Sequence, residues 1–295
     1  MEAAYIIYYD KEAKKNNGFI EMLKKACIKH NIDLRYMSFE DINFMSESIF
    51  IETFKSAIFI INRTRQYRLS QKFEDMNLKV FHSSKITELG NDKYKTYCYL
   101  KNYFKKNKPV TDKDWIADTI FVNADKLKES IDKYIGKDYV IKSVDGHGGS
   151  QVFLLKDIND SDRLSTIYKN LKGHDCIVQK RIDSDSNDIR VYILFGEIYA
   201  AVLRHGNNGF KSNFSLGGSV SEYFPDERQK RFIEKFIDAF GKDELNMAGI
   251  DFIVTRQGEL IFNELEEMVG SRMLYNCSKH DIVNEYVEHI ANMYK

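Results

Sequence analysis

The 295-residue chain lacks the features that mark several large classes of protein. Its four cysteines, Cys27, Cys98, Cys176 and Cys277, are scattered and form no CxxC pair, which argues against a zinc site and a disulfide framework. Lysine plus arginine and aspartate plus glutamate both number 44, so the net charge indicates neither a nucleic-acid nor a membrane partner. The apolar run at the N-terminus is too short for a signal peptide or a membrane span. We therefore expect a soluble, cytoplasmic protein.

The length is sufficient for two or three domains with cores of their own. The first ninety residues alternate between strand and helix patterns. Strands are predicted at Ala4–Tyr9, Ile32–Met37 and Ser56–Asn62, and helices at Gly18–His30 and Leu69–Met76. This alternation indicates a small open α/β domain.

Two arginines, Arg63 and Arg65, follow the apolar strand that ends at Asn62. Ligands of open α/β sheets bind at the carboxyl ends of the strands. These two residues are therefore candidates for ligand contact, with ordinary surface charge as the alternative interpretation.

A glycine-rich loop separates two predicted strands in the sequence YVIKSVDGHGGSQVFLL. The strands are Tyr139–Ile141 and Val152–Leu155, and His147 in the loop is the one histidine that we single out. Between the strands lie a lysine and a group of small residues: Lys142, Gly146, Gly148, Gly149 and Ser150. The Rossmann fingerprint and the P-loop both open a helix, so neither applies. Glycines let backbone N–H groups approach an anion, and the lysine supplies positive charge. We interpret the loop as a flap over nucleotide phosphates; a simple hairpin turn is the alternative.

A predicted β-hairpin near the C-terminus carries three acidic side chains. Its strands are Gly249–Val254 and Glu259–Glu264, and Asp251 lies inside the first. Glu264 and Glu266 project to one side if the second strand continues that far, because a strand has a period of two. Three converging carboxylates repel one another unless a cation lies between them, and hard oxygen ligands suit Mg²⁺. Solvated residues on an exposed strand face are the alternative.

Three further segments lie between the glycine loop and the acidic hairpin. Residues 175–181, DCIVQKR, predict an apolar strand, and Asp188–Phe195 with Glu197–Arg204 predicts a second hairpin. The segment His205–Gly218 is rich in glycine, asparagine and serine and predicts a loop.

Together these pieces resemble the ATP-grasp superfamily and, within it, the RimK-like amino-acid ligases. The resemblance runs from about Asn91 to Tyr275. It rests on these segments, in order: Asn91-Asp92-Lys93, YVIKSVDGHGGSQV, IVQKRI, NDIRVYILFGEIYAAVLRHGNNGFKSNFSLGGS, GIDFI and FNELEE. The resemblance implies a mixed α/β (α+β) ATP-grasp fold. Its parts would be an N-terminal subdomain, residues 1–89, and a central and a C-terminal subdomain, residues 90–182 and 183–295, that clamp ATP.

The resemblance also implies a role for each matched residue. Lys93 and Lys142 would contact the phosphates, and Arg204 and Lys142 would act in catalysis. Two Mg²⁺ or Mn²⁺ ions would be held by the three carboxylates of the acidic hairpin, Asp251, Glu264 and Glu266. The remaining nucleotide-binding residues would be Gly146, Gly148, Gly149, Ser150, Gln179, Lys180, Arg181, Ile182, Asp188, Arg190, Lys211, Ser212 and Asn213.

The chain departs from the family pattern at several positions. Lys180 stands where the family often has an acidic residue, and Glu266 where asparagine is usual. The sequence MVGSRMLY replaces the common turn of a small residue, proline and glycine, in a region that borders the acceptor site. The substrate therefore cannot be inferred from the resemblance. Arg63 and Arg272 are our candidates for holding substrate carboxylates, since guanidinium matches carboxylate bidentately; structural ion pairs are the alternative.

The implied activity is a two-step ligation of small-molecule or peptide substrates. A carboxylate attacks the γ-phosphate of ATP to give an acylphosphate and ADP, and an amine then attacks the acyl carbon to give an amide and phosphate. Arg204 would stabilise the transferring phosphoryl group or the tetrahedral intermediate. A kinase on this fold and a non-catalytic nucleotide-binding regulator are the alternatives. The donor, the acceptor and any homo-oligomer are left open by the sequence.

Overall fold

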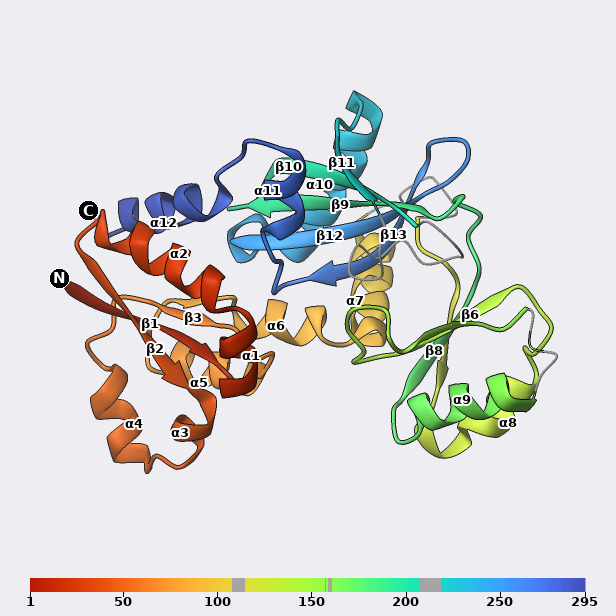
Figure 1. The fold of residues 1–295 in the computed structure, drawn as a ribbon, viewed down its shortest axis with the longest axis horizontal. Helices are drawn as coiled ribbons and strands as arrows, with labels where there is room; N and C mark the ends of the chain where they lie inside the picture. The colour runs from red at the N-terminus through yellow and green to blue at the C-terminus, as the bar shows by residue number, and fades with distance from the viewer. Residues whose placement is uncertain (108–114, 157, 159–160, 207–218, 295) are drawn as a thin grey trace.

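The computed structural model describes residues 1–107, 115–156, 158, 161–206 and 219–294. These residues form three sheets with helices packed on them (Figure 1). The sheet nearest the N-terminus is parallel, with the order β2-β1-β3-β4, and the other two are antiparallel, with the orders β5-β8-β6-β7 and β11-β10-β9-β12-β13. Among the described residues, no helix combines the length and apolarity needed to cross a membrane.

The N-terminal sheet agrees with the α/β pattern expected from the sequence. Its strands are β1 Glu2–Tyr8, β2 Ile32–Ser38, β3 Ile60–Asn62 and β4 Val80–Phe81. Its helices are α1 Asp10–Lys15, α2 Asn17–Ile28, α3 Phe39–Asn43, α4 Glu47–Phe54, α5 Tyr67–Asp75 and α6 Ser84–Gly90. Of the predicted strand Ser56–Asn62, only the last three residues belong to β3, although Ile58 and Phe59 also make backbone hydrogen bonds to β1. Helices α1 and α3 are too short to show a helical period in the sequence.

The central sheet carries the glycine loop and is covered by helices on one face (Figure 1). Its strands are β5 Thr119–Val122, β6 Tyr139–Ser143, β7 Val152–Leu154 and β8 Cys176–Lys180. Its helical elements are η1 Ala124–Lys126, α8 Leu127–Asp132 and α9 Ser161–Leu171. Ile131, Ile167 and Leu171 of these helices are buried against Ile141 and Val178 of the strands.

The C-terminal sheet contains both predicted hairpins. Its strands are β9 Asn187–Leu194, β10 Glu197–His205, β11 Ser219–Tyr223, β12 Met247–Val254 and β13 Leu260–Glu266. Strand β13 therefore continues to Glu266, as the acidic hairpin requires, whereas β11 was not expected. The helical elements are α10 Glu227–Phe240, η3 Lys242–Glu244, α11 Arg272–Cys277 and α12 Ile282–Asn292. Phe236 of α10 stacks on Phe262 of β13, with ring centroids 5.2 Å apart.

Two helices join cores that belong to different sheets. Leu100 and Phe104 of α7, Lys93–Lys106, pack in the core of the C-terminal sheet. Helix α12 instead lies beside α2 and buries Tyr286 and Ile290 in the core shared with the N-terminal sheet (Figure 1). The three sheets fall inside the predicted subdomains, but α7 and α12 pack outside theirs, so the boundaries stay a prediction. The segment after β13 lies between the N-terminal and C-terminal sheets, because Val269 is buried in the core that these sheets share.

Candidate active site

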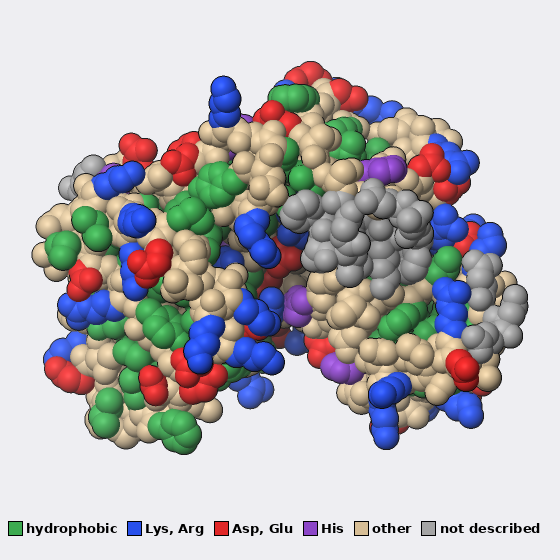
Figure 2. All heavy atoms as spheres, viewed as in Figure 1, with side chains coloured by type: hydrophobic (Ala, Val, Ile, Leu, Met, Phe, Trp, Pro, Cys, Tyr) green, Lys and Arg blue, Asp and Glu red, His purple; other side chains and the backbone are tan. Residues whose placement is uncertain are grey.

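A cleft lies between the glycine loop of the central sheet and strands β12 and β13 of the C-terminal sheet. It encloses about 860 Å³ of space, including the part open to solvent. Figure 2 shows a hollow between the two halves of the molecule with basic, acidic and His side chains along it. The predicted residues that line the cleft are Lys93, Lys142, Gly146, Gly148, Gly149, Arg181, Ile182, Asp188 and Glu264.

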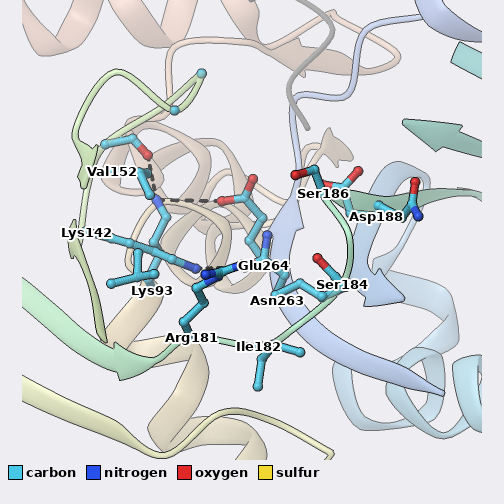
Figure 3. Close-up of a pocket in the computed structure, with 16 residues that line it drawn as sticks. Lys93, Lys142, Val152, Arg181, Ile182, Ser184, Ser186, Asp188, Asn263 and Glu264 are labelled. Carbon is cyan, nitrogen blue, oxygen red and sulfur yellow. Dashed lines mark hydrogen bonds and ion pairs between the residues drawn. The ribbon is translucent and has the colours of Figure 1, made fainter. Parts of the chain in front are cut away.

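Two lysines from different elements point into this cleft (Figure 3). Asp92 caps α7 by accepting hydrogen bonds from the backbone N–H groups of Tyr94 and Lys95 at 3.0 and 2.9 Å, which places Lys93 at the first helical position. Nζ of Lys93 donates to the carbonyl of Gly146 at 2.5 Å and lies 3.8 Å from Oε2 of Glu264. The glycine loop, the helix and the acidic strand thus meet at one ammonium group.

Lys142, at the end of β6, is the second ammonium group. Its Nζ donates to Oδ1 of Asn263 at 2.8 Å. Burial lowers the pKa of Lys142 from 10.5 to about 8; the charge of Glu264 opposes this shift and that of Lys93 adds to it. Two ammonium groups with few carboxylate partners therefore line one cleft, and this charge arrangement suits a polyanion such as a triphosphate.

Asn263 reaches the cleft because of a β-bulge that the sequence did not reveal. Asp251 pairs with Glu264 across β12 and β13, but the next residue, Phe252, pairs with Phe262, so Asn263 is the extra residue. A bulge changes the direction of a side chain. Asn263 and Glu264 therefore line the same cleft although they are adjacent in a strand. Strict alternation would have put them on opposite faces.

Four buried charges lie across strands β10, β9 and β12. Arg204 is directly opposite Asp188, and Arg190 directly opposite Asp251. Arg204 donates to both Asp188 oxygens at 2.5 and 2.9 Å and to Oδ2 of Asp251 at 2.7 Å, while Arg190 holds both Asp251 oxygens at 2.7 Å. Arg190 also donates to Glu266 at 3.3 Å. We name these residues, Asp188, Arg190, Arg204 and Asp251, the ion network.

The ion network changes what can be expected of the predicted metal ligands. Burial would raise the pKa of Asp251, but Arg190 and Arg204 outweigh it and hold that pKa at about 2. Within the described part of the chain, no three acidic, His or Cys side chains gather as a metal-binding group. Guanidinium groups occupy both oxygens of Asp251. Burial raises the pKa of Glu264. The charge of Lys93 opposes this shift, and the charges of Asp251 and Glu266 add to it. A cation beside Glu264 and Glu266 would relieve this repulsion.

Strand β8 and the two residues after it contribute a mixture of buried and exposed positions. Gln179 is buried, and its amide donates to Oγ1 of Thr119 at 2.8 Å. Lys180 is exposed, and Arg181 lies 3.6 Å from Asp138. Ile182 and Arg181 line the cleft, whereas Ser150 in the glycine loop is exposed and donates to the His147 carbonyl at 3.3 Å. Three of the predicted nucleotide-binding residues lie outside the described residues: Lys211, Ser212 and Asn213.

The two arginines predicted to hold substrate carboxylates have different surroundings. Arg63 is 7% exposed, and it donates to the hydroxyl of Tyr8 and to the carbonyls of Met268 and Val269. These contacts tie the N-terminal sheet to the segment after β13, so a substrate would have to displace them. The contacts favour the structural alternative for Arg63. Arg272 is exposed at the start of α11.

Sequence reasoning missed a buried acid next to the predicted ligands. Glu267 is 2% exposed; its Oε1 accepts from Asn91 at 2.7 Å, and its Oε2 has no hydrogen-bond partner. Burial raises its pKa to about 7, and the charge of Glu266 adds to the shift. Gly90 leaves room for this carboxyl, because a Cβ there would lie 2.7 Å from Oε2. The cleft also contains Ser184 and Ser186, which precede β9, and Asn187, which begins it.

Comparison with known proteins identifies the family of the chain. A model of the RimK-like ATP-grasp domain matches residues 107–290, more than half of the chain. The chain belongs to the RimK-like ATP-grasp family. An uncharacterized protein of Mycoplasma genitalium is 27% identical over 303 residues, which cover 99% of this chain and 93% of the relative.

Two further comparisons concern named ligases. A probable alpha-L-glutamate ligase of Shewanella pealeana is 24% identical over 224 residues, which cover 75% of this chain and 46% of the relative. The D-alanine–D-alanine ligase from Bacillus anthracis, solved in complex with ATP, has a TM-score of 0.67 at 13% identity over 100% of both chains, and so shares the fold. The predicted ATP-grasp fold, RimK-like family and ATP-dependent ligase class are confirmed. Individual site residues and substrates stay predictions.

The ion network generates a prediction about stability without metal. Asp251→Ala leaves Arg190 and Arg204 buried with fewer anionic partners, and loss of one member of a buried ion pair costs about 3–5 kcal/mol. We expect a loss of this size in the free energy of unfolding, measured by urea titration in EDTA. Glu266→Ala is the matched control: its side chain is 23% exposed, so its loss should cost under about 1 kcal/mol. Equal losses would contradict a structural role for Asp251.

The lowered pKa of Lys142 predicts how ATP affinity depends on pH. Below pH 8 the ammonium group is charged in the free protein and attracts phosphate; above pH 8 it loses its proton, and phosphate must draw the proton back. The affinity of the wild type should therefore fall as pH rises through 8, approaching about tenfold per pH unit relative to Lys142→Met. The measurement is calorimetric titration with ATP between pH 7 and 9.5. Parallel profiles for the two proteins would show that Lys142 does not face the phosphates.

Proposed function

We propose that this chain is an ATP-dependent carboxylate–amine ligase that forms an amide through an acylphosphate. The observation that carries the proposal is the pair of ammonium groups, Lys93 and Lys142, that face one cleft under a glycine loop. Val140 and Val152 line the same cleft, so it offers an apolar wall for a base as well as charge for phosphates. The ligase relatives support the same reaction class.

The reaction needs two steps. In the first, an oxygen of the donor carboxylate attacks the γ-phosphorus of ATP, and ADP leaves. In the second, an amine nitrogen attacks the acyl carbon, a proton is lost from nitrogen, and phosphate leaves with the former carboxylate oxygen. The first step is phosphoryl transfer, in which the protein mainly positions groups and neutralises charge. The chain would therefore act through its cations and through exclusion of water.

Each part of the site has a proposed role in these steps. Lys93 and Lys142 neutralise phosphate oxygens, and the glycine loop covers them so that water does not reach the acylphosphate. Arg204 remains our proposal for the cation that stabilises the transferring group, since its partner Asp188 lines the cleft. The other cation of the ion network, Arg190, keeps β9 and β12 in register beside Glu264.

The acidic residues fit a divalent cation. Glu264 and Glu266 lie on one strand, burial together with the charges of Asp251 and Glu266 raises the pKa of Glu264, and hard carboxylate oxygens suit Mg²⁺ or Mn²⁺. Asp251 would complete the set only by exchanging a guanidinium contact for the ion. A bound divalent ion would supply charge neutralisation for the β- and γ-phosphates.

Amide formation separates this proposal from the two alternatives. The assay offers ATP, Mg²⁺ and paired pools of amino acids, short peptides and other carboxylic acids, and measures ADP together with product mass. We expect ADP and an amide in equal amounts, and neither with Lys142→Ala. A phosphorylated product without amide would favour a kinase, and nucleotide binding without any ADP would favour a regulator. Either result would overturn the proposal.

Glu266 and Glu264 should differ in how their substitution changes the Mg²⁺ requirement. Glu266→Asn removes one negative charge beside the proposed ion, so it should keep activity but need about tenfold or more Mg²⁺, because a charge contact near 4 Å is worth roughly 4 kcal/mol before desolvation. Glu264→Ala should be nearly inactive at every Mg²⁺ concentration. The measurement is ADP release against Mg²⁺. An unchanged requirement in Glu266→Asn would show that Glu266 is not a ligand.

A further inference from the structure

The loop after β3 holds Arg65 in an unusual backbone conformation. Oδ1 of Asn62 accepts from the N–H and hydroxyl of Thr64 at 3.1 and 2.7 Å, and its amide donates to the carbonyl of Gln66 at 3.2 Å. Arg65 lies inside this turn with φ of +63°. Residues other than glycine rarely adopt that region, and such strain tends to persist where it serves a binding site. The turn thus projects a long cationic side chain from the carboxyl end of the sheet.

One donor of the Arg65 guanidinium group, its Nε–H, has no partner in the protein. Its Nε is buried without a hydrogen-bond partner, and none of the ion pairs that the described residues form includes it. Arg63, two residues earlier, differs in this respect because its Nε and Nη2 both donate to protein oxygens. A buried donor without a partner is costly. A bound ligand would remove that cost.

Arg65 lies at the junction of the glycine loop and the acidic strand. Through Arg63, its loop is hydrogen-bonded to the carbonyls of Met268 and Val269, directly after β13. Burial lowers the pKa of His147 in the glycine loop to about 4, and the charge of Arg65 is the next largest cause. Figure 2 shows Lys and Arg side chains gathered on the N-terminal side of the hollow. The side chain is therefore close to both walls of the site but bound to neither.

We propose that Arg65 binds a carboxylate of the substrate other than the one that reacts. The planar fork of guanidinium pairs bidentately with a carboxylate, and Arg is preferred where such recognition matters. This inference rests on the proposed ligase function and adds to it a class of substrate: one with a second, spectator carboxylate. Two substrates can supply that group, a dicarboxylic donor or an amino acid that enters as the amine.

The test compares substrates that differ only in that carboxylate. For the amine arm the probes are L-glutamate and its α-amide; for the donor arm they are glutarate and its monoamide. Binding of each probe is measured by calorimetry in the presence of Mg·ADP, and KM by ADP release, with wild type and Arg65→Gln. We expect Arg65→Gln to weaken binding of the carboxylate probe in one arm tenfold or more. Binding of the corresponding amide and of Mg·ATP should not change. The arm that responds identifies the source of the carboxylate.

The control variant is Arg68→Gln, three residues later in α5, where the exposed guanidinium contacts only Tyr67 among the described residues. It should match the wild type in both arms, and Arg65→Lys should recover part of the affinity. Equal losses for carboxylate and amide, or none for either, would overturn the role of Arg65. Probe binding that depends on Arg65 without any amide product would support the site and overturn the ligase function. Failure of both binding and turnover would overturn both.

Discussion

The pairing of Arg190 with Asp251 across β9 and β12 is the interaction on which the rest of the site depends. Both side chains are buried, and each is directly opposite the other in the strand register. A buried charge is tolerated only when paired. A shift of one residue in either strand would leave both charges unpaired, so the pair fixes the register. That register in turn sets where Glu264 and Asn263 meet the cleft, because β13 is aligned on β12.

The cations of the cleft divide into two kinds with different physical settings. Arg190 and Arg204 are each paired with carboxylates inside the C-terminal sheet, where they connect β9, β10 and β12. Lys93 and Lys142 have mostly amide and carbonyl partners, so their charge remains available to a ligand. The lowered pKa of Lys142 is the electrostatic result of that arrangement. A bound polyanion would compensate the positive charges of Lys93 and Lys142.

Much of the site was predictable because its residues lie in local patterns. The glycine loop follows a strand that ends in lysine, and Asp92-Lys93 opens a helix by ordinary capping, so both are visible in one stretch of sequence. Asn263 was not predictable, since the bulge that turns it depends on pairing with a distant strand. The engagement of Asp251 by two arginines was missed for the same reason. Cross-strand partners become visible only once the register is known.

The same distinction explains the two arginines after β3. In the sequence they are equivalent, two residues apart at the end of an apolar strand. In the fold, Arg63 donates to the carbonyls of Met268 and Val269, while Arg65, in the left-handed conformation, leaves its Nε without a partner. Arg63 connects the N-terminal sheet to the segment after β13, and this contact also fixes the loop that carries Arg65 beside that segment. Arg63 therefore has a structural role that positions the loop of Arg65, for which we propose the ligand contact. The residue type alone does not distinguish these two roles.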